Sequence, residues 1–203
     1  MKILLATSNK GKIREIQSLL STTGDFEVVG LDQFNLGDIP ETGTTFLENA
    51  LLKAKTASEK TGLITLADDS GLVVPYLGGE PGVYSARYSG KDATDAKNNA
   101  KLLEKLKGVP LEKRQAFFVC VLVAYAPQGK YFWVEGKWEG RIAFEPRGNK
   151  GFGYDPIFID LETGKHAAEM DLEEKNQKSH RGKALQVFLK KWPKFLTEIK
   201  GEL

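Results

Sequence analysis

Residues 116–134 read AFFVCVLVAYAPQGKYFWV and carry the strongest β signal in the chain. The first part, Ala116–Tyr125, is an unbroken run of mostly apolar residues rich in β-branched and aromatic types, which is typical of a buried strand. Pro127-Gln128-Gly129-Lys130 has turn chemistry, and a second strand-like run follows over Tyr131–Val134. These residues predict a long β-hairpin, and the rest of the fold has to be built around it.

Strand and helix patterns alternate on either side of this hairpin. Short apolar runs predict further strands over residues 2–7, 26–29 and 63–67. The expected helices share capping residues and apolar positions spaced three and four apart. They lie after Asn9, between the capping box Thr45-x-x-Glu48 and Gly62, from near Asp92 to Gly108, and from near Ser179 to Trp192. This order predicts an α/β fold with a mixed sheet flanked by helices.

The composition excludes several classes of protein. The chain of 203 residues carries 29 Lys and Arg against 27 Asp and Glu, a formal charge of +2, whereas a dedicated DNA-binding protein needs a large basic excess. Cys120 is the only cysteine, which excludes a disulfide within the chain and a multi-cysteine zinc site. No apolar run approaches the roughly 20 residues that cross a bilayer, and Met1–Ala6 ends too soon for a signal peptide. We therefore expect a cytoplasmic protein with one domain, or two lobes that share a core, and with no nucleic acid or membrane as partner.

The segment Thr7–Lys12 (TSNKGK) lies where the first strand should lead into the first helix. The start of a helix presents free backbone N–H groups and a partial positive charge, which attract phosphate. Gly11 allows the backbone to come close to a ligand, and Lys10 and Lys12 add full charges. A capped surface helix with solvated lysines fits the same residues equally well, because the segment lacks the spaced glycines of a Walker motif.

Two adjacent carboxylates, Asp68 and Asp69, follow the strand predicted over 63–67. Ligands of open α/β sheets bind at the carboxyl ends of strands, and adjacent strand residues point to opposite faces, so we expect one of the two to face a site. Mg²⁺ takes one or two protein carboxylates and completes its shell with water and substrate phosphate, and Glu41 could be a second acid for it. The alternative is a polar turn whose aspartates cap backbone groups.

A glycine-rich segment, Gly148–Asp155 (GNKGFGYD), carries two aromatic residues. Its glycines allow backbone conformations that a Cβ forbids, and Phe152 and Tyr154 offer flat faces on which a base could stack. The alternative is a surface turn whose rings pack back onto the core. Further along, Lys175 and Ser179-His180-Arg181 lie at the entrance to the last helix, where an arginine can pair with a ring oxygen or a phosphate, although a lone histidine is more often structural.

Taken in order, these segments resemble one family. TSNKGK, ETGTTFLENALLKA, ADDSGL, GVYSARYSG, GFGYDPIF and EEKNQKSHRGKAL are similar in sequence and spacing to the inosine triphosphate pyrophosphatase family, from about residue 3 to about residue 190. The resemblance implies an elongated α/β fold with two lobes around a nucleotide-binding cleft, and a homodimer. It also implies Mg²⁺-dependent hydrolysis of dITP, ITP, XTP and dXTP to the monophosphate and pyrophosphate, which removes these non-standard purine nucleotides from the pool.

The resemblance assigns roles to individual residues as well. Asp69 would be the catalytic carboxylate and a metal ligand, and Glu41 would be the other ligand. The residues that would bind the substrate are Thr7, Ser8, Asn9, Lys10, Gly11, Lys12, Lys53, Ser70, Phe152, Gly153, Tyr154, Asp155, Lys175, His180 and Arg181. One position departs from the family pattern: many bacterial relatives have an acid immediately before Glu-Thr-Gly, where this chain has Pro40.

Two other functions fit the same residues. A pyrophosphatase of similar fold could act on pyrimidine or modified nucleotides, and a non-catalytic module could bind a nucleotide or RNA in the same pocket. The Asp68-Asp69 pair argues against the non-catalytic module, because carboxylates repel phosphate unless a metal lies between them. The aromatic-glycine segment beside Ser179-His180-Arg181 favours a purine over a pyrimidine.

Overall fold

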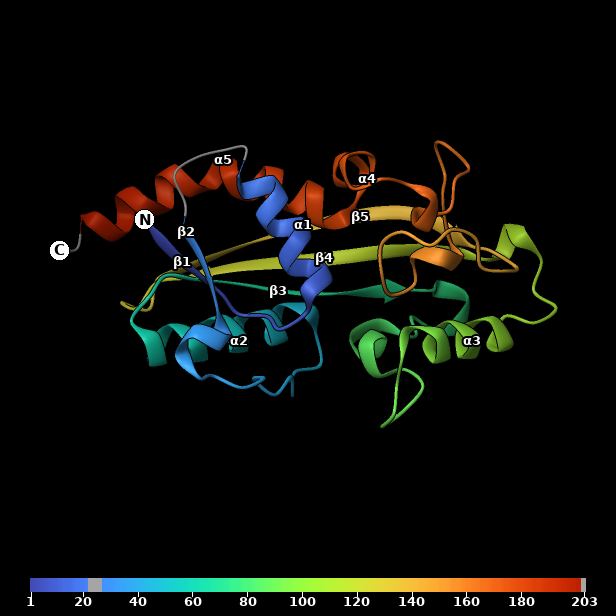
Figure 1. Ribbon diagram of the computed structural model, residues 1–203, viewed down its shortest axis with the longest axis horizontal. Helices are drawn as coiled ribbons and strands as arrows, with labels where there is room; N and C mark the ends of the chain where they lie inside the picture. The colour runs from blue at the N-terminus through green and yellow to red at the C-terminus, as the bar shows by residue number, and fades with distance from the viewer. Residues whose placement is uncertain (22–26, 202–203) are drawn as a thin grey trace. The chain divides into compact units, whose positions relative to one another are not determined.

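The computed structural model describes residues 1–21 and 27–201, and the strands of this part of the chain form one mixed sheet (Figure 1). The sheet has six strands in the order β2-β1-β3-β4-β5-β6, with β1 parallel to β2 and β3, and β6 antiparallel to β5. The strands are β1 (Lys2–Leu5), β2 (Glu27–Gly30), β3 (Thr65–Val73), β4 (Gln115–Tyr125), β5 (Tyr131–Ile142) and β6 (Phe158–Asp160). The helices are α1 (Lys10–Leu20), α2 (Phe46–Thr61), α3 (Asp95–Lys105), α4 (Leu172–Lys178) and α5 (His180–Lys200). The predicted α/β class with a mixed sheet is confirmed.

The predicted hairpin is present, and its second strand is longer than the pattern indicated. β4 and β5 are neighbours in the sheet, and the N–H of Ala126 donates to the carbonyl of Lys130 at 2.8 Å to close the turn. β5 continues from Val134 to Ile142, with buried residues alternating with exposed ones such as Glu139. A strand covered by the core on one face alternates in this way, and its charged residues interrupt the apolar run that marks a fully buried strand.

The chain divides into two compact units. The first comprises residues 1–69, 120–136 and 181–203, and the second comprises 70–119 and 137–180. Within the first unit, α1 and α5 lie on one side of the strands and α2 lies on the other (Figure 1). The single domain with a cleft between two lobes stays a prediction.

Each unit has its own apolar core. In the first unit, alternate residues of β1 and β4 pack against the inner faces of α1 and α5. This core includes Ile3, Leu5, Ile16, Leu66, Cys120, Leu122, Phe188 and Trp192. In the second unit, the rings of Phe118, Trp138 and Phe158 form an aromatic cluster, with the centroids of Phe118 and Phe158 4.4 Å apart.

The helix ends largely follow the local signals. Thr45 and Glu48 form the capping box that starts α2, and Gly62 ends it in the left-handed conformation at φ 70°. The last helix was expected to end near Trp192, but α5 passes through Pro193 because Phe195 and Ile199 continue its buried face. β2 begins at Glu27, and Phe26, included in the predicted strand, lies outside the described residues. Within 1–21 and 27–201, no helix combines the length and apolar character that spanning a membrane requires.

Candidate active site

Asp68 and Asp69 lie in the middle of β3, and the expectation that they follow the end of a strand is wrong. The strand continues to Val73 because Leu72 and its neighbours enter the core of the second unit. Both carboxylates are buried, with Asp68 0% and Asp69 3% exposed. Since successive strand residues point to opposite faces, the two acids have different surroundings.

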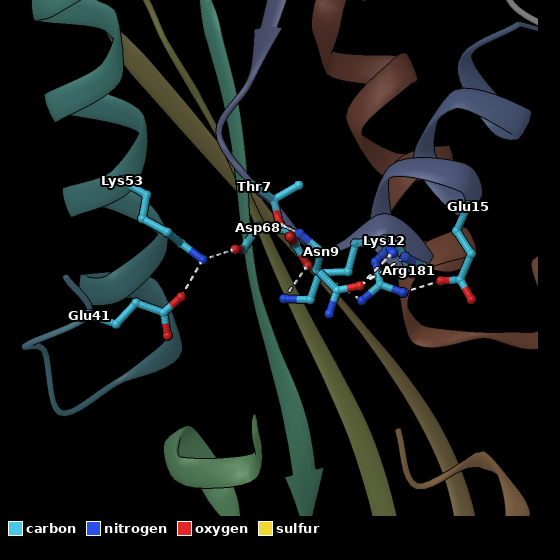
Figure 2. A network of polar contacts seen from close by, with 9 residues as sticks. Thr7, Asn9, Lys12, Glu15, Glu41, Lys53, Asp68 and Arg181 are labelled. Atoms are coloured by element: carbon cyan, nitrogen blue, oxygen red, sulfur yellow. Dashed lines mark hydrogen bonds and ion pairs between the residues drawn. The ribbon is translucent and has the colours of Figure 1, made fainter. Parts of the chain in front are cut away.

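The side chain of Asp68 belongs to a buried network that joins three elements (Figure 2). Its Oδ2 lies 3.3 Å from Nζ of Lys12 on α1 and 3.5 Å from a guanidinium nitrogen of Arg181 on α5. Arg181 also pairs with Glu15 of α1, which is itself buried. Burial alone would raise the pKa of Asp68, but the positive charges of Lys12 and Arg181 together outweigh burial, so that its pKa lies well below its usual range. Asp68 is therefore a fixed negative charge.

Lys53 of α2 lies on the other side of β3 (Figure 2). Its Nζ donates to Glu41 Oε1 at 2.7 Å and to the backbone carbonyl of Asp68 at 2.5 Å. Burial lowers the pKa of Lys53, but the charges of Asp68, Glu41 and Asp69 raise it by more. Lys53 is thus held as a cation within a set of carboxylates.

Asp69 is the acid of this cluster whose pKa is raised. Its pKa is raised to about 7: burial is the largest cause, the positive charge of Lys53 opposes the rise, and the negative charge of Glu41 adds to it. Its Oδ2 is buried and has no hydrogen-bond partner among residues 1–21 and 27–201. A carboxyl that titrates near neutral pH suits a general base, and perturbed acids of this kind concentrate at functional sites.

The donor set around Asp69 fits Mg²⁺ better than a cation that needs a full protein cage. Within the described part of the chain, no group of three or more His, Cys, Asp or Glu side chains could hold a metal ion. Mg²⁺ needs only one or two carboxylates and otherwise binds water and phosphate oxygens. The unbonded oxygen of Asp69 and the half-buried Glu41 supply such a pair, so the residues fit the ion.

The segment Thr7–Lys12 is held by its own side chains. Asn9 Oδ1 accepts the N–H groups of Gly11 at 2.9 Å and Lys12 at 3.1 Å, which confirms Asn9 as the cap of α1. Ser8 donates to Asp38 at 2.6 Å, and Lys10 is exposed. The segment therefore combines a capped helix start with one lysine, Lys12, that forms an ion pair with Asp68.

The glycine-rich segment of the second unit divides its two aromatic residues between different environments. Tyr154 is buried in the core and its hydroxyl donates to the carbonyl of Ser85 at 2.7 Å, so for this ring the packing alternative holds. Phe152 is half-buried, with Nζ of Lys175 4.6 Å from its ring centroid. Lys175 also donates to Asp155 at 2.6 Å, and the N–H of Phe152 donates to the same carboxylate oxygen at 3.1 Å. The structure thus brings Phe152, Asp155 and Lys175 together.

His180 is buried in the second unit. Its ring stacks on Phe118 with centroids 4.8 Å apart and planes inclined by 13°. His180 therefore has a packing role, whatever else it binds. Ser70, which follows Asp69 in β3, is half-buried.

Comparison with known proteins identifies the family. The model of the Ham1 family matches residues 3–191, nearly the whole chain. This chain belongs to the Ham1 family. It is 54% identical over 200 residues to a dITP/XTP pyrophosphatase of Nitratidesulfovibrio vulgaris, covering 95% of this chain and 96% of that one. A dITP/XTP pyrophosphatase of Escherichia coli O157:H7 is also 54% identical, over 93% of this chain and 96% of its own length.

The fold comparison agrees. A HAM1 protein from Coxiella burnetii has 44% sequence identity and a TM-score of 0.87, covering 96% of this Ham1-family chain and 99% of that structure. The mixed α/β architecture is therefore that of the family.

Several polar residues around these clusters were not predicted from the sequence. Glu15 lies three residues after Lys12 on one helix, a spacing that marks an acid on the same face, but its partner Arg181 is 166 positions away. Asp38, which accepts a hydrogen bond from Ser8, lies in no motif that marks it as part of a site. Asp95 and Asn99 are spaced four apart on α3, and both contact the glycine-rich segment.

Proposed function

We propose that this Ham1-family chain hydrolyses dITP, ITP, XTP and dXTP to the monophosphate and pyrophosphate, and so removes these nucleotides from the pool. The observation that carries the proposal is the buried Asp69, with a pKa raised to about 7, beside Glu41 and the Lys53 cation. The names of the relatives at 54% identity support the choice of reaction and substrate.

We propose Mg²⁺ as the cofactor, held by Asp69 and Glu41. When bound, the ion would offset phosphate charge and lower the pKa of a water molecule. The pairing of Lys53 with Glu41 already balances one of the two carboxylates. Glu41 itself supplies the second carboxylate, so the proposal needs no acid at Pro40.

In the proposed reaction, Asp69 accepts a proton from the water that attacks the α-phosphorus. The bond from the α-phosphorus to the bridging oxygen breaks, and pyrophosphate leaves with the bonding electrons. Lys53 and Lys12 stabilise the negative charge that grows on the leaving group, together with Lys10, the polar residues Thr7, Ser8 and Asn9, and Gly11 at the start of α1. Asp68 keeps Lys12 in position, since the two are paired at 3.3 Å.

The second unit is proposed to recognise the base. Phe152 offers a ring for stacking, and Lys175 and Asp155 offer a donor and an acceptor next to it. By resemblance, Ser70, Gly153, Tyr154 and His180 would also contact the substrate, as would Arg181 of the first unit. Hypoxanthine and xanthine carry a six-position carbonyl that accepts from a donor, whereas the amino group of adenine would leave that donor unpaired, at a cost of about 1–3 kcal/mol for each buried group.

A substrate panel tests the proposal. The purified protein is mixed with dITP, XTP, ITP, ATP, GTP and UTP, with Mg²⁺ or with EDTA, and pyrophosphate and single phosphate are measured separately. We expect Mg²⁺-dependent pyrophosphate release that is fastest with dITP, ITP and XTP. Fastest turnover of UTP would instead indicate a pyrimidine enzyme, and binding without turnover would indicate a non-catalytic module.

The family resemblance leads us to propose also a homodimer, and we propose that it resides in the cytoplasm. Light scattering of the full chain in solution tests the oligomeric state, for which we expect twice the 22.5 kDa of one chain. A mass of one chain at micromolar concentration would refute it.

A further inference from the structure

We propose that Asp95 and Asn99 of α3 are positioning residues that set base selectivity by holding both peptide groups of Gly153. The inference rests on the proposed function, because it assumes that the segment around Phe152 and Asp155 binds the base. Neither α3 residue carries a role in the resemblance to the family. Their effect would be exerted entirely through the backbone of the segment.

The two residues form hydrogen bonds with the backbone of Gly153 from one face of α3. The N–H of Gly153 donates to Asp95 Oδ2 at 2.9 Å, and its carbonyl accepts from Asn99 Nδ2 at 3.1 Å. Residues four apart lie one above the other on a helix, so Asp95 and Asn99 face Gly153 together. Asn99 is only 7% exposed, and water competes little for its bond.

The space beside Gly153 is open on the side where a side chain would lie. Its φ is +62°, a conformation that favours glycine, and a Cβ added there would meet no atom within 4 Å. A pocket of about 460 Å³ is lined by α3 residues, Asp95 and Asn99 among them, and by the segment from Gly148 to Gly153. Open space therefore separates parts of α3 from the segment, and at Gly153 two hydrogen bonds join them.

The neighbours of Gly153 are the residues proposed to meet the base. Phe152 precedes it and bonds through its N–H to Asp155, which in turn accepts from Lys175. On the other side, Tyr154 is anchored in the core through Ser85. Because Tyr154 is fixed, loss of the bonds to Gly153 would mainly allow Phe152 to move. Both the position of the Phe152 ring and the bond from its N–H to Asp155 depend on the conformation of the segment.

Single substitutions separate the roles of the two bonds. Asp95→Ala and Asn99→Asp each remove one bond, the second by placing a carboxylate against the Gly153 carbonyl. Asp95→Asn keeps an acceptor and should restore the bond. The matched control is Asn98→Asp, the same chemical change at the adjacent buried position, which faces Ser89 and Ser85 instead of Gly153.

Steady-state kinetics of the full chain with ITP and ATP, and the melting temperature, are measured for each variant. We expect Asp95→Ala and Asn99→Asp to raise KM for ITP by about five- to tenfold, the factor that one hydrogen bond of ordinary net strength represents. The kcat should stay within about twofold, the ITP preference in kcat/KM should fall by a similar factor to the rise in KM, and Asp95→Asn should resemble the unchanged protein.

Two results overturn the inference, and they differ from failure of the proposed function. An unchanged ITP preference in both variants overturns it, as does an equal loss of preference in Asn98→Asp, which would mark a general loss of structure. If the unchanged protein releases no pyrophosphate from ITP, dITP or XTP, the proposed function fails and this inference fails with it.

Discussion

Replacing Asp69 by asparagine should make the protein more stable at neutral and alkaline pH while it removes the activity. Burial raises the pKa of Asp69 from 3.8 to about 7 in the folded protein, whereas the unfolded chain keeps the ordinary value. The folded state therefore holds this proton more tightly. The stability from this site is complete below pH 3.8 and is lost as the pH rises through about 7. Asparagine is neutral at every pH, so the variant does not lose this stability as the pH rises.

The magnitude follows from the two pKa values. At about 1.4 kcal/mol for each pH unit, the difference between 3.8 and about 7 corresponds to a penalty on the order of 4 kcal/mol for the charged form at pH 8. Asp69→Asn should thus unfold at a higher urea concentration than the unchanged protein at pH 8. The difference should shrink towards pH 4, where the unchanged protein is also neutral at this position.

Urea denaturation in EDTA at pH 4, 6 and 8 measures this directly. Asp92→Asn, at an exposed position of the second unit, is the control and should leave the unfolding free energy nearly unchanged at each pH. The reasoning is refuted if Asp69→Asn is less stable than the unchanged protein at pH 8, or if its advantage does not depend on pH.

Three further substitutions test the surrounding contacts. Glu15→Gln breaks a buried ion pair with Arg181 and should lower the free energy of unfolding by about 3 kcal/mol, measured in urea; a change below 1 kcal/mol would contradict the network. Lys53→Met removes a cation that lowers the pKa of Asp69, so the acid limb of the pH profile of kcat/KM should move up by roughly one pH unit; a shift to lower pH would refute this sign. Tyr154→Phe should cost about 1 kcal/mol of stability, since the Ser85 carbonyl keeps its bond from Asn98; a loss of several kcal/mol would show that the hydroxyl does more.

Elements with local signals could be predicted from the sequence. The hairpin of β4 and β5, the Asn9 cap and the capping box of α2 depend on residues within a few positions of one another. Element boundaries that are set by contacts with distant residues could not be predicted in this way. β3 runs on through Asp68 and Asp69, and α5 runs through Pro193, because core residues further along the chain continue the buried face.

The candidate site shows the same division. Asp69 and Glu41 could be picked out as candidate site acids from their motifs, and Lys53 from the family resemblance, but the pKa of Asp69 depends on burial that no pattern in the chain displays. The pairing of Glu15 with Arg181 joins positions 166 apart, which spacing rules cannot reach. Tyr154 looked like a stacking face because its segment is glycine-rich, yet its ring completes the core of the second unit.

The central claim is that water attacks the α-phosphorus of a non-standard purine triphosphate, with Asp69 as the base. Hydrolysis of dITP in ¹⁸O-labelled water with Mg²⁺, followed by mass spectrometry of both products, tests this claim most directly. The account predicts one ¹⁸O atom in the monophosphate and none in pyrophosphate, with turnover lost in Asp69→Asn. Label in pyrophosphate or in released single phosphate would contradict it.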